Sequence, residues 1–158
     1  ARAEQRAEDT DATADAALSL AQFLPTAPLA IVTTPQLAAA EVAERAGTIG
    51  MTTRQRVAGV IENMAYLPCP HCDERVDVFG SGGGDAVVAA LSRSFGVAVP
   101  LLGQVPLDPR IVSGGDNGLP FVLAHPDAPA ARELLKIADS LAIREHGLAG
   151  RPLGLQPA

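Results

Sequence analysis

Residues 29–63 read LAIVTTPQLAAAEVAERAGTIGMTTRQRVAGVIEN, and the order of apolar and polar segments in them indicates the fold class. The runs at 29–34 and 57–63 are continuously apolar and rich in β-branched residues, as is typical of strands buried on both faces. The segment between them predicts a helix, with Thr34 as its N-cap and Pro35 in its first position. Strand–helix–strand order with buried strands indicates a parallel sheet.

The alternation continues along the rest of the chain. We expect a third short strand at 99–102 and a return strand at 76–79, behind the chain's two cysteines. Expected helices span 15–24, 82–96, 108–118 and 126–145. The sequence therefore predicts an α/β fold: a partial three-layer arrangement of a parallel sheet with flanking helices.

Composition excludes several classes of function. The net charge of −6 argues against a nucleic-acid partner, which needs clustered Lys and Arg. The only lysine is Lys136, so any mechanism that needs a catalytic lysine has a single candidate. No window approaches the apolar length of a membrane span, so we expect no membrane partner. The first fifteen residues, ARAEQRAEDTDATAD, are polar and mostly acidic, unlike a secretory signal. We therefore expect a cytoplasmic protein.

The only two cysteines, Cys69 and Cys72, form a CPHC motif. A redox dithiol of the thioredoxin type requires a helix immediately after the motif, but the polar segment DERVDVFG follows. A structural zinc site requires four ligands, and no second CxxC exists. A zinc-binding or partner-binding module that shares its metal between two chains stays open, as does a passive turn.

His71 and the glycine run near the cysteines can be interpreted without a metal or a phosphate. We expect His71, between the cysteines, to be a solvated polar residue rather than a ligand. The glycines at 82–84 precede a helix as a phosphate cradle would, but Asp85 follows them and no lysine is near. We interpret them as a tight return from a cysteine hairpin.

Four segments in order resemble one family: TTPQLAAAEVAERAG, GVIENMAYLPCPHC, DVFGSGGG and LLGQVPLDPRIVSGGDNGLPFV. They look like the Mrp/ApbC iron–sulfur cluster carriers, which are P-loop ATPases of the deviant-Walker class. The resemblance extends from about residue 15 to about residue 142. It implies the fold of the C-terminal half of a P-loop NTPase domain.

The resemblance also implies a function for the cysteines. Cys69 and Cys72 of two subunits would hold a bridging 4Fe–4S cluster, in a homodimer formed through a hairpin at 66–84. The cluster would pass from this dimer to apo iron–sulfur proteins. Two thiolates from each chain supply the four ligands that such a cluster requires.

ATP is the second cofactor that the resemblance implies. Asn63 would contact the adenine edge, and Pro106, Leu107 and Asp108 would lie in the loop that flanks the base. Capping of the strand end explains Asn63 equally well. Thr33 and Thr34 lie at a strand end, where ligands collect in open α/β sheets, and capping of the next helix explains Thr34 just as well.

The chain also departs from the family pattern. Nothing matches the phosphate-binding GxxxxGK[ST] loop, and the stretch at 10–15 lacks the glycines and prolines of the family's switch segment. We therefore expect a fragment: a leader at 1–13, the C-terminal part of a P-loop ATPase-like domain at 14–146, and a tail at 147–158.

The missing loop gives a direct prediction. This chain alone should not hydrolyse ATP above background, because no lysine or glycine loop holds the β and γ phosphates. Phosphate release by the purified chain measures this. A turnover comparable to that of an intact P-loop carrier, abolished by changing Asp11 or Asp15, would contradict it.

Overall fold

The computed structural model describes residues 19, 23–24, 26–53 and 55–145, and the side chains to 142. The predicted leader and tail lie outside the described residues, and so does most of the helix expected at 15–24. No described helix is long and apolar enough to cross a membrane.

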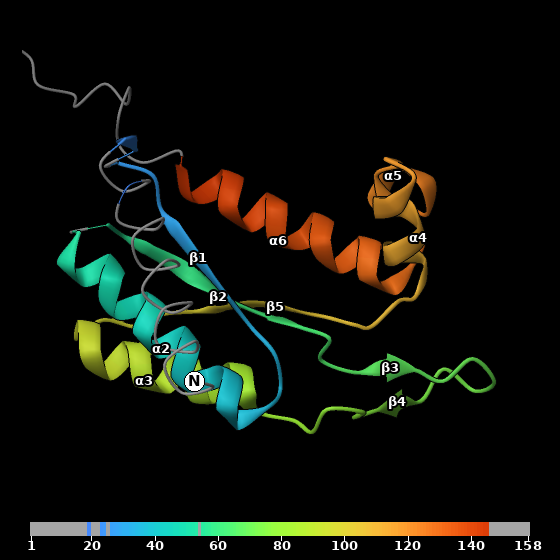
Figure 1. Cartoon of the computed structure of the whole chain (residues 1–158), viewed down its shortest axis with the longest axis horizontal. Coiled ribbons are helices and arrows are strands. Elements are labelled where there is room, and N and C mark those ends of the chain that lie inside the picture. The colour runs from blue at the N-terminus through green and yellow to red at the C-terminus, as the bar shows by residue number, and fades with distance from the viewer. Residues whose placement is uncertain (1–18, 20–22, 25, 54, 146–158) are drawn as a thin grey trace, which may run out of the picture.

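Three parallel strands form the central sheet, in the order β1-β2-β5 (Figure 1). Two very short strands, β3 and β4, pair antiparallel as a separate hairpin. The strands are β1 (Leu29–Thr33), β2 (Val57–Asn63), β3 (Leu67–Pro68), β4 (Arg75–Val76) and β5 (Leu101–Val105). The helices are α2 (Leu37–Thr52), α3 (Gly83–Phe95), α4 (Arg110–Asp116), α5 (Phe121–Ala124) and α6 (Pro129–Glu145).

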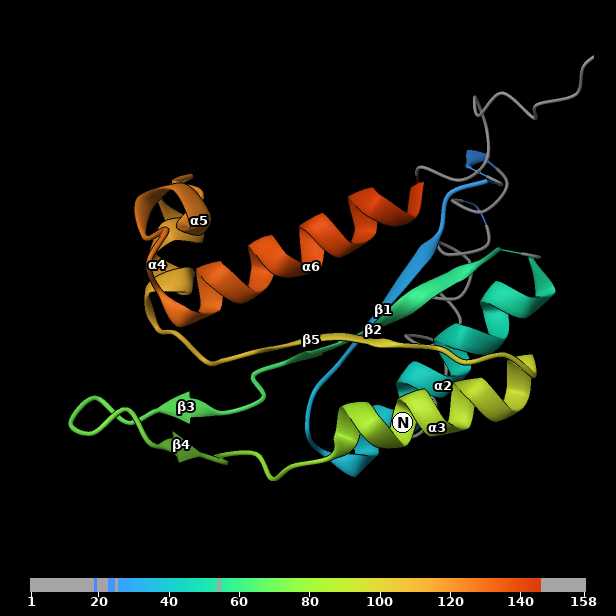
Figure 2. The ribbon, with the colours of Figure 1, turned by 180° about the vertical axis from the view of Figure 1, so that it is seen from behind.

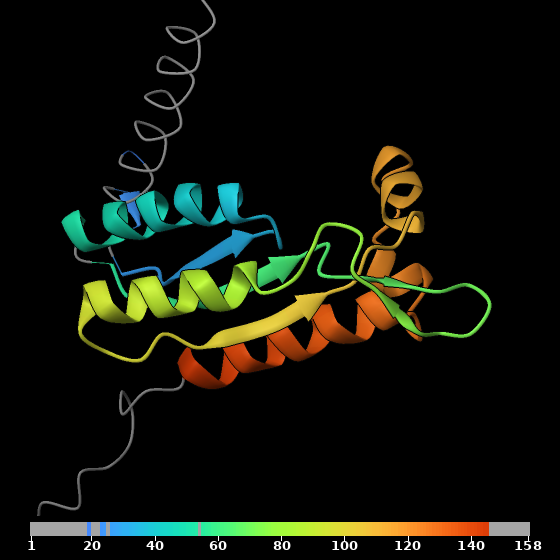
Figure 3. The same cartoon turned by 90° about the horizontal axis from the view of Figure 1, so that it is seen from below.

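Helices cover both faces of the sheet, which confirms the predicted α/β class. The helices α2 and α3 lie on one side and α6 on the other, as the front and back views show (Figures 1 and 2). Viewed from below, the β3–β4 hairpin projects beyond the end of the sheet (Figure 3).

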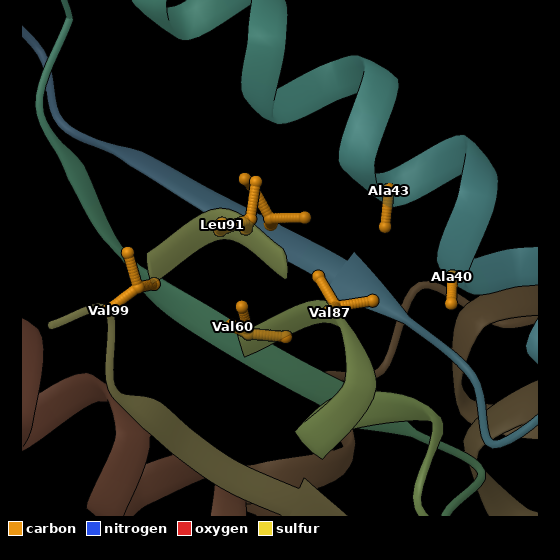
Figure 4. Close-up of a cluster of buried hydrophobic side chains, with 7 residues drawn as sticks. Ala40, Ala43, Val60, Val87, Leu91 and Val99 are labelled. Atoms are coloured by element: carbon orange, nitrogen blue, oxygen red, sulfur yellow. The ribbon is translucent and has the colours of Figure 1, made fainter. Parts of the chain in front are cut away.

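The first core lies between the sheet and the pair α2–α3 (Figure 4). Ala and Val side chains dominate it, so the helices approach the strands closely. Burial of this apolar surface is the main stabilising term for the layer. Its buried members are Ile31, Ala40, Ala43, Val60, Val87, Leu91 and Val99.

The second core lies between α6 and β5, with α5 at its end. Its buried members are Val105, Phe121, Ala128, Ala130, Ala131 and Ile137. Successive residues of a strand point to opposite faces, so Val32 of β1 points to this side while Ile31 points to the first core. Val32 is 59% exposed. On this side α6 therefore covers β5 more completely than β1.

The start of α2 differs from the prediction. The residue at the N-cap position is Gln36, with extended backbone and no side-chain cap, so the prediction of Thr34 as N-cap is wrong. The Thr34 hydroxyl instead donates to the Gln36 side-chain oxygen, which removes it from the helix amides.

Two predicted strands are displaced. The third runs from Leu101 to Val105 rather than over 99–102, because Val99 is buried in the core and its amide donates to Ser92 Oγ at 3.0 Å. The return strand is Arg75–Val76 rather than 76–79, because the Val78 amide bonds back to the Val76 carbonyl and ends the pairing. The short helix α5 was not predicted.

An irregular register between β2 and β5 determines which side chains meet at the end of the sheet. Val60 pairs with Leu101 but Ile61 pairs with Gly103, so one extra residue lies on β5. Beyond this bulge Glu62 is opposite Gln104. The bulge therefore brings two polar side chains together on the face that α3 covers.

At Gly83, α3 packs closely against the β1–α2 loop, and a substitution there tests this contact. A Cβ on Gly83 would lie 2.4 Å from the Thr34 carbonyl oxygen and 2.6 Å from that of Pro35. Gly83→Ala should therefore lower the free energy of unfolding by about 1–3 kcal/mol, measured by urea denaturation. Gly115→Ala is the control, because open space surrounds that helical glycine and alanine there should be neutral or stabilising. Equal unfolding midpoints for Gly83→Ala and the unsubstituted chain would contradict this packing.

Candidate metal centre

The two cysteines lie at the tip of the β3–β4 hairpin. The Cys69 amide donates to the Glu74 carbonyl at 2.9 Å, and the Asp73 amide donates to the Cys69 carbonyl at 2.9 Å. Asp73 has a φ of 58°, a left-handed conformation that Asp tolerates better than most residues. These contacts close a tight loop that carries both thiols on the same tip.

Both thiols are free, and they differ in environment. Cys69 is half-buried and Cys72 is exposed. The backbone amide of His71, the Cys72 thiol and the Cys72 amide, in that order, hydrogen-bond to the Cys69 sulfur and lower its pKa. The negative charge of Asp73 acts in the opposite direction. The lowered pKa favours the thiolate form of Cys69, and it is the thiolate that binds metals.

The described residues contain no cluster of three or more His, Cys, Asp or Glu side chains placed to hold a metal ion. His71 is exposed and does not form such a group with the two cysteines. Within the part of the chain that the structure describes, the hairpin offers a metal two ligands, fewer than zinc or an iron–sulfur cluster requires.

The predicted nucleotide residues lie where β2 and β5 end. Asn63 pairs with Val105 in the sheet. Two backbone bonds join the loops beyond them: the Ala65 amide donates to the Val105 carbonyl at 3.0 Å, and the Leu107 amide donates to the Tyr66 carbonyl at 2.7 Å. The structure thus brings Asn63 and the 106–108 loop to the root of the cysteine hairpin.

The side chains of these candidate nucleotide-binding residues differ in their exposure to solvent. Asn63 is exposed, and its side-chain oxygen accepts a hydrogen bond from the Met64 amide at 2.9 Å, as a strand-end cap does. The Pro106 side chain is fully buried, so it shapes the loop from inside. Leu107 is half-buried.

Asp108 is held by a partner that sequence reasoning missed. Arg110 donates to both Asp108 carboxylate oxygens, at 2.9 and 2.6 Å, and its backbone amide donates to the same carboxylate. The Arg110 side chain is the main reason that the pKa of Asp108 is lowered. The sequence DPR at 108–110 could have indicated this ion pair, because it places opposite charges two residues apart.

A buried carboxylate was also missed. Glu62, in β2, is fully buried, and one of its oxygens accepts the Gly84 amide at 2.8 Å. The other accepts a hydrogen bond from the Gln104 side chain. A glutamate inside the apolar strand VAGVIEN could have been recognised, because a buried charge requires partners.

The glycine run has a packing role. The first-turn Gly84 amide of α3 is already bonded to the Glu62 carboxylate, and a Cβ on Gly84 would lie 3.0 Å from Glu62 Cβ. Gly82 has a φ of 84°, which favours glycine. These contacts agree with a tight return to the sheet rather than a phosphate cradle.

Comparison with known proteins agrees with this architecture. A family model described as "ParA: NUBPL iron-transfer P-loop NTPase" matches residues 11–142. An iron-sulfur cluster carrier protein of Mycobacterium leprae is 56% identical over 146 residues, which is 92% of this chain and 38% of the relative. A protein of the same name from Saccharolobus solfataricus is 38% identical, covering 82% of this chain and 42% of the relative.

Solved structures give a similar picture. The MinD cell division protein of Aquifex aeolicus superposes with a TM-score of 0.52 at 20% identity, over 80% of this chain and 45% of that protein, which shows the fold alone. A nucleotide-binding protein in complex with ADP from Archaeoglobus fulgidus is 34% identical, with a TM-score of 0.50, over 64% of this chain and 39% of that protein.

The parallel sheet and its flanking helices are thus those of part of a P-loop NTPase-like domain. The chain belongs to the NUBPL-type iron-transfer family of P-loop NTPases, which includes the iron–sulfur cluster carrier proteins. It spans about two fifths of the length of the curated relatives it matches.

In the metal-free chain, two substitutions near Cys69 should shift the pKa of its thiol in opposite directions. Cys72→Ala removes a thiol that stabilises the Cys69 thiolate, and should raise the pKa of Cys69. Asp73→Asn removes a repelling charge while keeping a residue that tolerates positive φ, and should lower that pKa. The pH dependence of Cys69 alkylation by iodoacetamide, followed by mass spectrometry, measures both. Identical profiles in all three proteins would contradict the assigned contacts.

Proposed function

We propose that Cys69 and Cys72 of two copies of this chain hold a bridging 4Fe–4S cluster as cargo and release it to apo iron–sulfur proteins. Membership of the iron–sulfur carrier family supports this proposal. The single observation that carries it is the placement of two free thiols, and only these two cysteines, on an exposed hairpin tip.

The ligand count supports a shared site. A four-iron cluster takes four thiolates, and each chain has two cysteines. A two-fold axis between two hairpins would place the same pair from each copy around one cluster, as isologous dimers do. We therefore propose a homodimer through the hairpin.

The solvent exposure of the hairpin tip supports a role in transferring the cluster. Every residue from 70 to 81 is exposed, so the tip is accessible to the thiols of an acceptor. Thiolate exchange at a metal depends on such access and on the thiolate character of the attacking sulfur. A cluster held there would be well suited to delivery and poorly suited to permanent storage.

We also propose that the adjoining edge of the sheet contributes the base side of an ATP site. Asn63 and Leu107 would contact the base, while the buried Pro106 and the Arg110-bound Asp108 would hold the loop in place. Ligands of open α/β sheets bind at the carboxyl ends of the strands, where these residues lie. The hairpin root adjoins the same edge, so nucleotide and cargo would be neighbours.

Anaerobic reconstitution with iron and sulfide tests the cluster proposal. We expect about four irons and four sulfides per dimer, with visible absorbance. Cys69→Ser and Cys72→Ser should each remove most of the cluster, because one chain cannot replace the lost ligand. His71→Ala is the matched control and should keep it.

The alternatives give different readings. A zinc module shared between two chains would bind metal without sulfide and without colour. A redox dithiol would bind no iron and would cycle against glutathione. Far-UV circular dichroism establishes that each protein is folded, and a folded, colourless protein after reconstitution would overturn the proposal.

A further inference from the structure

The distal part of the cysteine hairpin has no burial to hold it in place. Its strands contain two residues each, and residues 70–81 are all exposed. A two-stranded hairpin without a packed face is marginally stable in water. Something other than hydrophobic contact must therefore set the angle at which the thiols leave the sheet.

Arg75 is the side chain that connects this hairpin to the sheet. It pairs with Pro68 in the β3–β4 register, next to Cys69. Its Nη1 donates to the Gln104 side-chain oxygen at 3.3 Å, and its guanidinium lies over the Tyr66 ring, 4.6 Å from the centroid. Among the described residues, this is the only side-chain hydrogen bond from residues 67–76 to the sheet.

Gln104 is in turn fixed by a buried group. Its Nε2 donates to a Glu62 oxygen, and the second Glu62 oxygen accepts the Gly84 amide at 2.8 Å. Both Glu62 oxygens thus have a donor, in a residue with no exposed surface. The Gln104 amide cannot rotate freely, because one end must donate to Glu62 while the other accepts from Arg75.

We propose that Glu62, Gln104 and Arg75 form a polar chain that positions the cysteine hairpin for cluster binding. Arg75 and Gln104 are positioning residues: they touch no metal ligand, but they fix the arm that carries both ligands. This inference rests on the proposed cluster function, because a shared cluster requires two hairpins at a defined separation.

The direction of the hydrogen bonds makes the proposal sharply testable. In Glu62→Gln, the new amide must accept from Gly84, so it presents a donor to Gln104. Gln104 can then satisfy that donor only by turning its own donor toward Arg75, which has no acceptor to offer. The single change therefore breaks the chain at Arg75 while leaving side-chain size nearly unchanged.

The double variant Glu62→Gln with Gln104→Glu restores it. The carboxylate now at 104 accepts from the amide at 62 and from Arg75, so every donor again meets an acceptor. If these residues only stabilised the fold, each variant would lose stability according to the cost of burying a charge at position 62 or 104. A positioning role predicts rescue by the exchange.

The experiment uses the reconstituted full chain and three readouts. These are the rate of cluster loss to an iron chelator, the visible circular dichroism of the cluster, and hydrogen exchange of the hairpin amides in the metal-free chain. Arg75→Leu and Glu62→Gln should lose cluster about ten-fold faster, change the visible dichroism and speed hairpin exchange. Arg75 is also paired with the Asp77 carboxylate, at 2.7 Å. Lys136→Leu removes a second carboxylate-paired surface cation, on α6, and should behave like the unsubstituted chain.

Each outcome decides the question. Rescue of all three readouts by the double exchange supports the proposal. The proposal is wrong if Arg75→Leu changes neither the hydrogen exchange of the hairpin amides nor the rate of cluster loss. It is also wrong if the variants lose stability to urea uniformly, without an effect specific to the hairpin. If the unsubstituted chain binds no cluster but hairpin exchange still responds and is rescued, the proposed function fails while the positioning stands.

Discussion

The structure depends on satisfying one buried carboxylate at the end of the central strand. Glu62 lies in β2, between β1 and β5, and has no exposed surface. A charge taken out of water is tolerated only where donors surround it. The first turn of α3 and the side chain of Gln104 supply those donors. These contacts join the start of α3 to β2, and the β5 bulge places Gln104 opposite Glu62.

The site follows from this arrangement. Beyond Asn63 the chain leaves the sheet, forms the hairpin that carries Cys69 and Cys72, and returns through glycines close enough to pack on the β1–α2 loop. The thiols therefore lie on an exposed arm with a rigid root. That combination fits the proposed function, in which acceptor proteins reach two thiols that are held at a defined place.

Much of this architecture could be predicted from the sequence, because apolar runs and glycine breaks report local structure directly. The strands around Ile31 and Val60 and the CPHC hairpin were found in this way. What could not be predicted depends on contacts between distant segments. The bulge opposite Ile61 and the Glu62–Gln104 pair arise from strand pairing, and the start of β5 depends on the contact of Val99 with Ser92; no local pattern encodes these contacts.

Native mass spectrometry of the anaerobically reconstituted chain is the decisive test of a shared cluster, because it weighs the protein and its cargo together. We expect a dimer that carries the mass of one four-iron, four-sulfide cluster, and loss of both dimer and cluster when Cys69 and Cys72 are replaced together. A monomer that retains a complete cluster, or a dimer that carries zinc without sulfide, would contradict it.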